Sequence, residues 1–205
     1  MIADTRFITL WCNCHTMLRL SALACAARAV RAMATKADLR YVAKPASDAS
    51  GKVASPIVYP RSLYPEVEPF ASGHLAVGSG HEIYYEECGN KAGIPAVFLH
   101  GGPGAGCAPN HARFFDPEKW RVCLLDQRGC GRSEYPGASP LEDNETPRLV
   151  ADLEALRAEL LGAEPWACVL GGSWGSTLAL AYACSHAGAL RSLVLRGVCL
   201  MRARE

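Results

Sequence analysis

Residues 171–175, with the sequence GGSWG, have the spacing of a serine nucleophile held on a tight turn. A short apolar run at 167–170 precedes them, and an alanine- and leucine-rich stretch at 176–186 follows. In the G-x-S-x-G pattern the serine stands on a strained strand-to-helix turn, so that its hydroxyl projects. The N-terminus of the following helix favours negative charge that develops nearby. We therefore predict nucleophilic catalysis here; the alternative is a glycine-rich turn without chemistry. We call this turn, residues 171–175, the nucleophile elbow. Its residues are the nucleophile Ser173 and the glycines Gly171, Gly172 and Gly175.

A second glycine-rich segment, HGGPGAG at 100–106, follows the apolar run 96–99 and resembles an H-G-G type oxyanion loop. Glycines allow backbone N–H groups to approach a substrate oxygen closely. The sequence disfavours a phosphate-binding loop, because G-x-G-x-x-G would need glycine where Cys107 or Pro109 stands, and G-x-x-x-x-G-K-[ST] is absent. The loop residues are His100, Gly101, Gly102, Pro103 and Gly104. For the histidine we predict a loop-shaping role rather than that of a base.

The third segment, DQRGCGRS at 126–133, follows the apolar run 122–125. Its two glycines suit a compact turn, and an aspartate–arginine contact inside the loop would stabilise it. We predict a structural role for this loop.

The elements that must position these three segments alternate between strands and helices. Apolar runs predict strands at 75–77, 83–87, 96–99, 122–125, 167–170 and 193–195, the first two joined by a turn at 78–80. Helical spacing of leucines predicts a helix at 149–161, and a second is expected at 176–186. This alternation predicts an α/β fold on a mainly parallel sheet.

Composition excludes several classes of protein. The 205 residues are 50% hydrophobic and 20% charged, which fits one globular domain rather than a disordered chain. Lys and Arg number 21 against 20 acids, so no basic footprint for nucleic acid exists. No apolar run approaches the ~18 residues that span a membrane. The ten cysteines are scattered without a C-x-x-C pair, so we predict reduced thiols, no metal site and no cofactor.

The first seventy residues differ from the rest. Residues 1–44 are rich in arginine and alanine and poor in acids, which is typical of an organelle transit peptide or a disordered extension. An equally weighted interpretation is that translation starts at Met33. Residues 45–70 contain five prolines and predict an extended linker, so the domain is expected over 71–205.

Together, HGGPGAG, DQRGCGRS and GGSWGSTLALAYA resemble the prolyl aminopeptidase (proline iminopeptidase) family of the α/β-hydrolase fold, and so does the segment ASGHLAVGSGHEIYYEECGN. The resemblance covers about residues 60–205. It implies a cofactor-free serine peptidase that removes N-terminal proline from peptides. It maps the nucleophile onto Ser173 and the oxyanion hole onto the backbone N–H groups of Gly102 and Trp174. It also implies a cytoplasmic location, or a plastid or mitochondrion if 1–44 is a transit peptide.

Departures from that family lie mainly after the elbow. The triad order of the fold is serine, acid, histidine, yet no aspartate follows Ser173, and the only acid is Glu205. His186 would lie about 20 Å along the helix, beyond reach of the hydroxyl. The triad acid and histidine, the cap and about two of the family's eight strands are therefore absent, and we expect the N-terminal portion of a longer enzyme. We also expect the strand 193–195 to be an unpaired edge. Pro147 and Arg148 replace a family tryptophan and are expected to shift the helix start.

Three functional hypotheses follow. The first is a prolyl aminopeptidase acting through an acyl-enzyme, of which this chain is a truncated form. The second is a catalytically inactive α/β-hydrolase fragment or a binding partner of another hydrolase subunit. The third is an esterase of the same fold, because the elbow alone does not select the acyl group. Oligomeric state is not predicted.

Overall fold

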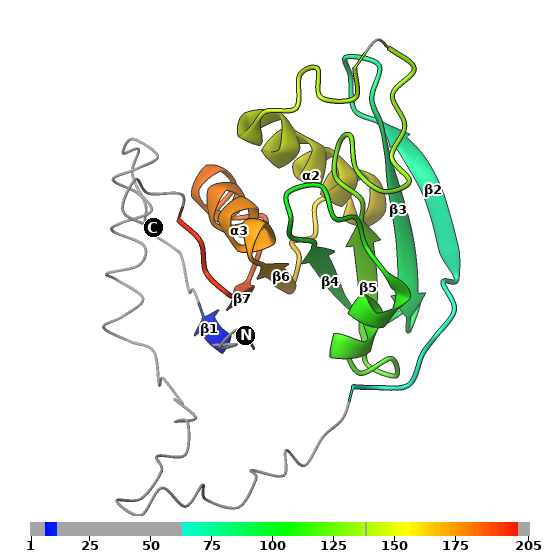
Figure 1. The fold of residues 1–205 in the computed structure, drawn as a ribbon. Helices are drawn as coiled ribbons and strands as arrows, with labels where there is room; N and C mark the ends of the chain where they lie inside the picture. The colour runs from blue at the N-terminus through cyan, green and yellow to red at the C-terminus, as the bar shows by residue number, and fades with distance from the viewer. Residues whose placement is uncertain (1–6, 12–62, 138, 201–205) are drawn as a thin grey trace, which may run out of the picture.

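The computed structural model describes residues 7–11, 63–137 and 139–200. These residues form one seven-stranded sheet with the order β1-β7-β6-β4-β5-β3-β2 (Figure 1). The strands are β1 (Phe7–Trp11), β2 (Ala71–Ala76), β3 (Glu82–Gly89), β4 (Ile94–Leu99), β5 (Trp120–Leu125), β6 (Cys168–Gly172) and β7 (Ser192–Arg196). The helices are the 3-10 helix η1 (Pro109–Phe114), α2 (Thr146–Leu161) and α3 (Trp174–Ser185). The predicted α/β hydrolase fold is confirmed by this arrangement.

Four strands in the middle of the sheet run parallel. β4 pairs with β5 on one side and with β6 on the other, and β6 pairs with β7. Leu99 at the end of β4 lies opposite both Leu125 of β5 and Gly171 of β6. The carboxyl ends of these strands therefore meet at one edge, and the loops 100–106 and 126–133 leave the sheet there together with the elbow.

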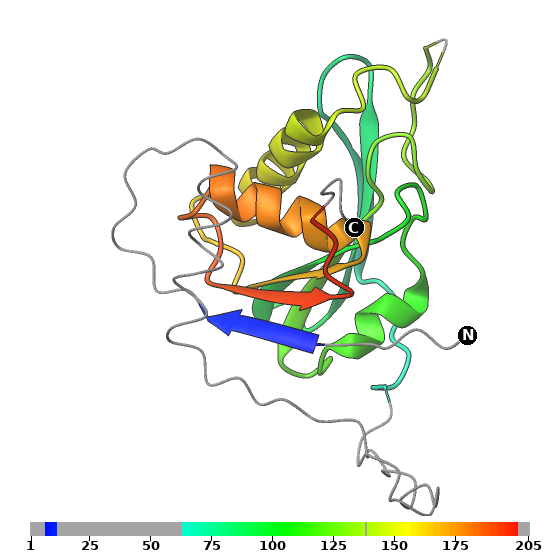
Figure 2. The ribbon, with the colours of Figure 1, turned by 60° about the vertical axis from the view of Figure 1, so that its left-hand side comes forward.

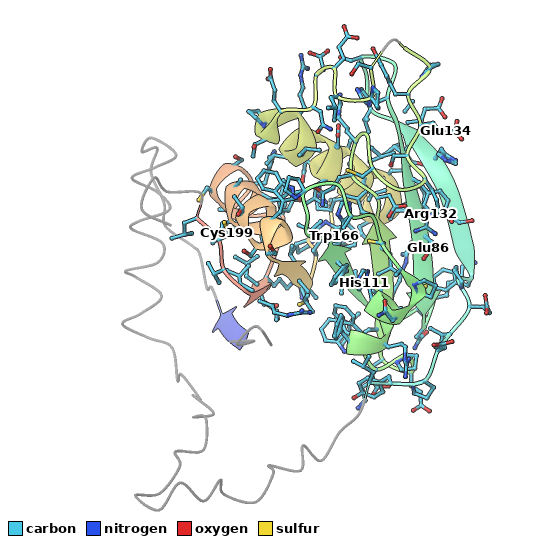
Figure 3. All side chains as sticks on the ribbon, in the orientation of Figure 1. Glu86, His111, Arg132, Glu134, Trp166 and Cys199 are labelled. Carbon is cyan, nitrogen blue, oxygen red and sulfur yellow. The ribbon has the colours of Figure 1, made fainter. Side chains whose placement is uncertain are left out.

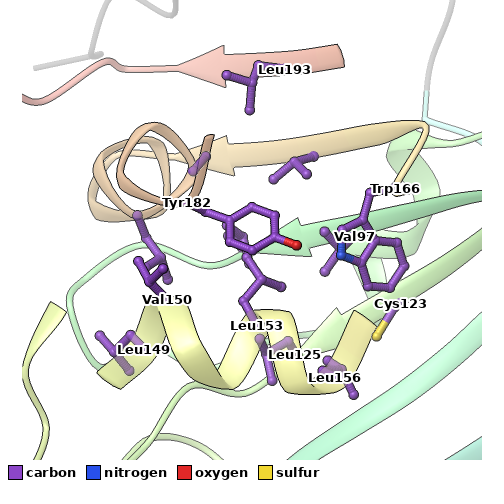
Figure 4. Close-up of a cluster of buried hydrophobic side chains, with 14 of the residues drawn as sticks. Val97, Cys123, Leu125, Leu149, Val150, Leu153, Leu156, Trp166, Tyr182 and Leu193 are labelled. Carbon is purple, nitrogen blue, oxygen red and sulfur yellow. The ribbon is translucent and has the colours of Figure 1, made fainter. Parts of the chain in front are cut away.

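The sheet has two apolar faces because strand residues alternate in direction. Val97, Leu99 and Val169 belong to a buried cluster with α2 and α3, which lie on the same face of the sheet (Figures 1 and 4). Ala96 and Phe98 belong to a second cluster on the other face, with residues of η1 and its C-terminal end. The sheet is therefore packed between α2 and α3 on one face and η1 on the other.

Each long helix begins where its sequence permits. α2 starts at Thr146 with Pro147 in its first turn, where proline's missing N–H costs no hydrogen bond. Its last residue is Leu161, and the C-cap Gly162 has a φ of 60°, which glycine adopts readily. Leu153 and Leu156 face the sheet and are fully buried. α3 begins directly after Ser173 and ends with His186 as its C-cap.

Backbone hydrogen bonds join β2 to β3 and join the segment before β2 to η1. β2 and β3 pair antiparallel, from Ala71 opposite Glu87 to Ala76 opposite Glu82. In the preceding segment, the Tyr64 N–H donates to the Arg113 carbonyl, at 3.0 Å. Residues 12–44, which carry most of the predicted transit peptide, and the linker residues 45–62 lie outside the described residues.

The prediction of an unpaired edge at β7 is wrong. β1 pairs antiparallel with β7, with Phe7 opposite Arg196 and Trp11 opposite Ser192 (Figure 2). β1 falls within the segment 1–44, which was interpreted from its composition. The run FITLW, rich in β-branched and aromatic residues, is the local signal that composition hides.

Within residues 7–11, 63–137 and 139–200, the helices are too short or too polar to span a lipid bilayer.

Candidate active site

Ser173 stands on a strained turn between β6 and α3. Its φ and ψ are 54° and −121°, a backbone conformation that non-glycine residues seldom adopt. The side chain is exposed, and its own N–H donates to the Arg196 carbonyl at the end of β7, at 2.8 Å. The strain is therefore held by the neighbouring strand, and the hydroxyl projects from the carboxyl edge of the sheet as a nucleophile requires.

The glycine pattern is explained by two close approaches. A Cβ on Gly175 would overlap the Leu99 carbonyl oxygen and lie 2.8 Å from that of His100. A Cβ on Gly101 would lie 2.9 Å from the Gly172 carbonyl oxygen and 3.2 Å from the Ser173 Cβ. The loop 100–106 thus packs its bare backbone directly against the nucleophile turn, which brings the two predicted motifs together.

The remaining elbow and loop residues occupy the positions that their roles need. Gly171 is buried, and a Cβ there would overlap the Gly175 carbonyl. Gly172 ends β6 with open space around it. Gly102 has a φ of 117° and is followed by Pro103 and Gly104, while Trp174 is the first residue of α3. The N–H groups of Gly102 and Trp174 remain the predicted oxyanion donors.

His100 is fixed in one tautomer inside the protein. It is 1% exposed, its Nε2 accepts from the Gln127 N–H at 3.1 Å, and its Nδ1–H therefore donates to the Gly101 carbonyl at 2.9 Å. Burial lowers the pKa of His100, against the opposing effects of the Gly101 bond and the Asp126 carboxylate. A neutral imidazole with both nitrogens occupied shapes the loop and is not available as a base.

Gln127 is a site residue that sequence reasoning missed. Its side-chain Nε2 donates to the His100 carbonyl at 3.0 Å, and its Oε1 accepts from the Trp174 indole N–H at 2.9 Å. The side chain is 3% exposed. Its position directly after Asp126, at the carboxyl end of β5, was the available signal, because that edge is where such folds place their sites.

The first turn of α3 is tied to the chain that leaves β7. The Ser176 hydroxyl donates to the Ser173 carbonyl at 2.6 Å and accepts from the Cys199 N–H at 3.2 Å. The Thr177 hydroxyl donates to the Cys199 carbonyl at 2.6 Å. The segment after β7 is thereby held beside the nucleophile turn.

Buried charge organises the loop 126–133. Asp126 accepts from the Cys107 N–H at 2.5 Å and from the Arg132 Nε at 2.8 Å, which confirms the predicted aspartate–arginine contact. Arg132 also donates to Glu86 on β3 at 2.6 Å (Figure 3). Burial acts to raise the pKa of Asp126, but the bonds from Arg132 and Cys107 outweigh it, so the pKa is lowered. The carboxylate stays ionised and joins the end of the glycine loop to its neighbour.

A second pair anchors the same loop to α2. Arg128 is 2% exposed and donates from Nε and Nη2 to both oxygens of Asp152, at 2.5 and 2.7 Å. Its Nη2 also donates to the Val77 carbonyl at 2.9 Å. This fork geometry gives Arg128 a structural role.

A base for Ser173 is not supplied by the described part of the chain. None of its histidines is hydrogen-bonded to the Ser173 hydroxyl, and His186 lies at the far end of α3. The described residues also contain no cluster of three or more metal-binding side chains. The described residues therefore place the predicted nucleophile Ser173 and the predicted oxyanion loop side by side.

Comparison with known families agrees with this geometry. The family model of the alpha/beta hydrolase fold matches residues 95–203. The chain belongs to this family.

The sequence is also similar to proline iminopeptidases. It is 55% identical over 145 residues to the one of Xylella fastidiosa strain Temecula1, covering 71% of this chain and 45% of that protein. It is 53% identical over 143 residues to the one of Neisseria gonorrhoeae, covering 70% and 45%. The protein of Arabidopsis thaliana is 53% identical over 152 residues, covering 74% and 39%. The chain spans less than half the length of these curated relatives.

Solved structures share the fold. VinJ superposes with a TM-score of 0.53 at 26% identity, covering 62% of this chain and 44% of VinJ. A lipase of Acinetobacter baumannii gives a TM-score of 0.51 at 22% identity, covering 62% and 40%. The second likeness shows the fold alone.

Proposed function

We propose that the protein to which this sequence belongs releases N-terminal proline from peptides. The observation that carries the hydrolytic part is the exposed Ser173, strained at φ 54°, with the bare Gly101 backbone packed against it. The identity of 53–55% to proteins named proline iminopeptidase supports the choice of proline.

The mechanism follows from the placed groups. The Ser173 oxygen attacks the carbonyl carbon of the N-terminal proline residue while a base takes the hydroxyl proton. The carbonyl oxygen becomes an oxyanion, which the Gly102 and Trp174 N–H groups stabilise, helped by the N-terminus of α3. The C–N bond then breaks, the base returns its proton to the leaving amine, and a prolyl ester on Ser173 remains. Water attacks this ester by the same route, releasing free proline and the serine.

Histidine is the base that suits this chemistry, oriented by a carboxylate. In this fold the chain order is serine, acid, histidine. We therefore propose that the acid and the histidine come from segments that follow β7 in the chain. The hydrogen bonds of Ser176 and Thr177 with Cys199 hold the start of the chain after β7 beside Ser173, which supports this proposal.

The experiment compares three substrates on the full-length protein: proline p-nitroanilide, alanine p-nitroanilide and p-nitrophenyl acetate. We expect the proline amide to give the largest kcat/KM. Ser173→Ala should abolish turnover of all three, and Ser72→Ala, at an exposed serine of the edge strand β2, is the matched control.

The outcomes separate the alternatives. A preference for the acetate with no cleavage of the proline amide would replace the peptidase by an esterase. A folded protein that turns over none of the three substrates would favour the inactive binding protein. Full activity in Ser173→Ala would contradict the nucleophile assignment.

A further inference from the structure

We propose that Gln127 is a positioning residue that couples the nucleophile elbow to the oxyanion loop. This inference rests on the proposed function for its catalytic consequence. The side chain of Gln127 bonds to Trp174, the residue after the nucleophile, and to His100, the first residue of the glycine loop. Both predicted oxyanion donors thus belong to segments that one buried side chain joins.

The orientation of the Gln127 amide is dictated by its partners. An indole N–H can only donate, so Oε1 must face Trp174. A backbone carbonyl can only accept, so Nε2 must face His100. Glutamate at this position would keep the first bond and lose the second, and leucine would lose both. The bridge therefore requires a side chain that donates at one end of a planar group and accepts at the other.

The bridge continues into the loop through His100. The Gln127 backbone N–H holds His100 Nε2 at 3.1 Å, His100 Nδ1 donates to the Gly101 carbonyl, and that carbonyl also accepts the Ala105 N–H at 3.3 Å. Gly102, the predicted donor, lies between Gly101 and Ala105 in this chain of bonds. The position of Gly102 is consequently tied to Gln127, whose side chain also holds the Trp174 indole.

The catalytic consequence concerns the transition state. Oxyanion donors act in proportion to how well they are placed before charge develops, and the ground-state carbonyl depends on them less. Loosening the bridge should therefore lower kcat and leave KM nearly unchanged. A displacement of about 1 Å costs up to about 100-fold in rate, which sets the upper scale for Gln127→Leu.

The first measurement is steady-state kinetics of Gln127→Leu, Gln127→Glu and Trp174→Phe in the full-length protein. We expect kcat to fall by about 10- to 100-fold in Gln127→Leu, and less in the isosteric Gln127→Glu, with KM within about twofold of wild type in both. The double variant Gln127→Leu/Trp174→Phe should lose less than the product of the two single losses, because both remove the same bond. A kcat within twofold of wild type in both Gln127 variants, or multiplicative losses in the double variant, overturns the proposal.

The second measurement needs no turnover. Amide hydrogen exchange at Ala105 is compared between wild type and Gln127→Glu by NMR. We expect exchange about three- to tenfold faster in the variant, the factor that losing one net hydrogen bond produces. The Ala105 N–H bonds to the Gly101 carbonyl and not to Gln127, so a purely local role would leave its exchange unchanged, and that result would overturn the coupling.

The kinetic and the exchange measurements together separate a failure of the Gln127 coupling from a failure of the proposed function. If wild type cleaves an ester but no proline amide, the substrate assignment fails, and kcat for the ester still tests Gln127 because the oxyanion is common to both reactions. If wild type is inactive on both, the hydrolase assignment fails, and the Ala105 exchange rate alone decides whether the bridge exists.

Discussion

The glycine loop 100–106 and the charged loop 126–133 leave the neighbouring strands β4 and β5 at the same edge of the sheet. The first is held by backbone packed against backbone, where Gly101 lies against Ser173. The second is held by ion pairs of side chains: Arg128 and Asp152 are both buried, and the partly exposed Arg132 bonds to the buried Asp126. A loop that presents N–H groups to substrate must keep its own surface bare, so its neighbour carries the side chains that fix both.

The largest effect is expected in the charged loop. Arg128→Met leaves the buried Asp152 carboxylate without its partner, and we expect the free energy of unfolding to fall by about 3–5 kcal/mol. Urea denaturation of the full-length protein measures it. The double variant Arg128→Met/Asp152→Leu should recover most of the loss, because no uncompensated charge remains. A single variant within about 1 kcal/mol of wild type would refute the anchoring role.

The packing of the nucleophile turn against β4 and the glycine loop should respond to added volume. Gly175→Ala forces a Cβ into the Leu99 carbonyl, and we expect a loss of about 1–3 kcal/mol in unfolding free energy with a larger proportional loss of turnover. Gly172→Ala is the matched control for stability, because a Cβ there meets nothing within 4 Å. Equal melting temperatures for both variants would show that the close approach does not constrain the elbow.

A smaller effect is expected from the histidine at the junction of the two loops. Burial lowers the pKa of His100 in the folded protein, so on acidification the unfolded chain binds a proton before the folded one does. Stability should fall as pH drops below the unfolded value of about 6.5. His100→Gln, which can still donate and accept, should show a shallower decline between about pH 7 and 5. Denaturation at three pH values checks this, and parallel curves for variant and wild type would count against it.

The smallest effect is expected away from both loops. Arg191 and Glu164 form an ion pair at 3.6 Å with side chains 65% and 72% exposed. Glu164→Gln should change the unfolding free energy by only a few tenths of a kcal/mol. The Arg191–Glu164 pair and the Arg128–Asp152 pair are both arginine–carboxylate pairs, and they differ in burial. Comparing their variants therefore isolates the effect of burial. A loss above about 1 kcal/mol would mean that burial is not the deciding variable.

Sequence predicted the parts of the fold that local pattern controls. The strand at 122–125 falls within β5 and the helix at 149–161 within α2, because apolar runs and leucine spacing report burial directly. The nucleophile motif could also be predicted from the sequence, because Ser173 and its glycines lie within five consecutive residues.

Two features could not be predicted in this way because they depend on partners distant in sequence. Arg128 finds Asp152 on another element, and Gln127 finds Trp174 47 residues away. Their motif was recognised, but a motif does not say which of its side chains turns inward. β1 was missed for a different reason, because an interpretation of residues 1–44 by their overall composition hides the short strand-like run FITLW.

That pairing also sets an order of events during synthesis. The residues of β1 leave the ribosome long before Ser192–Arg196, so the edge of the sheet cannot be completed until β7 has been made. Closing so long a loop is slow compared with joining β4 to β5, and the parallel centre should condense first. In the interval β1 is a strand with unmatched N–H and C=O groups, the kind of segment that chaperones shield and that pairs with foreign edges. The time at which β7 is synthesised therefore decides how long β1 remains without its partner strand.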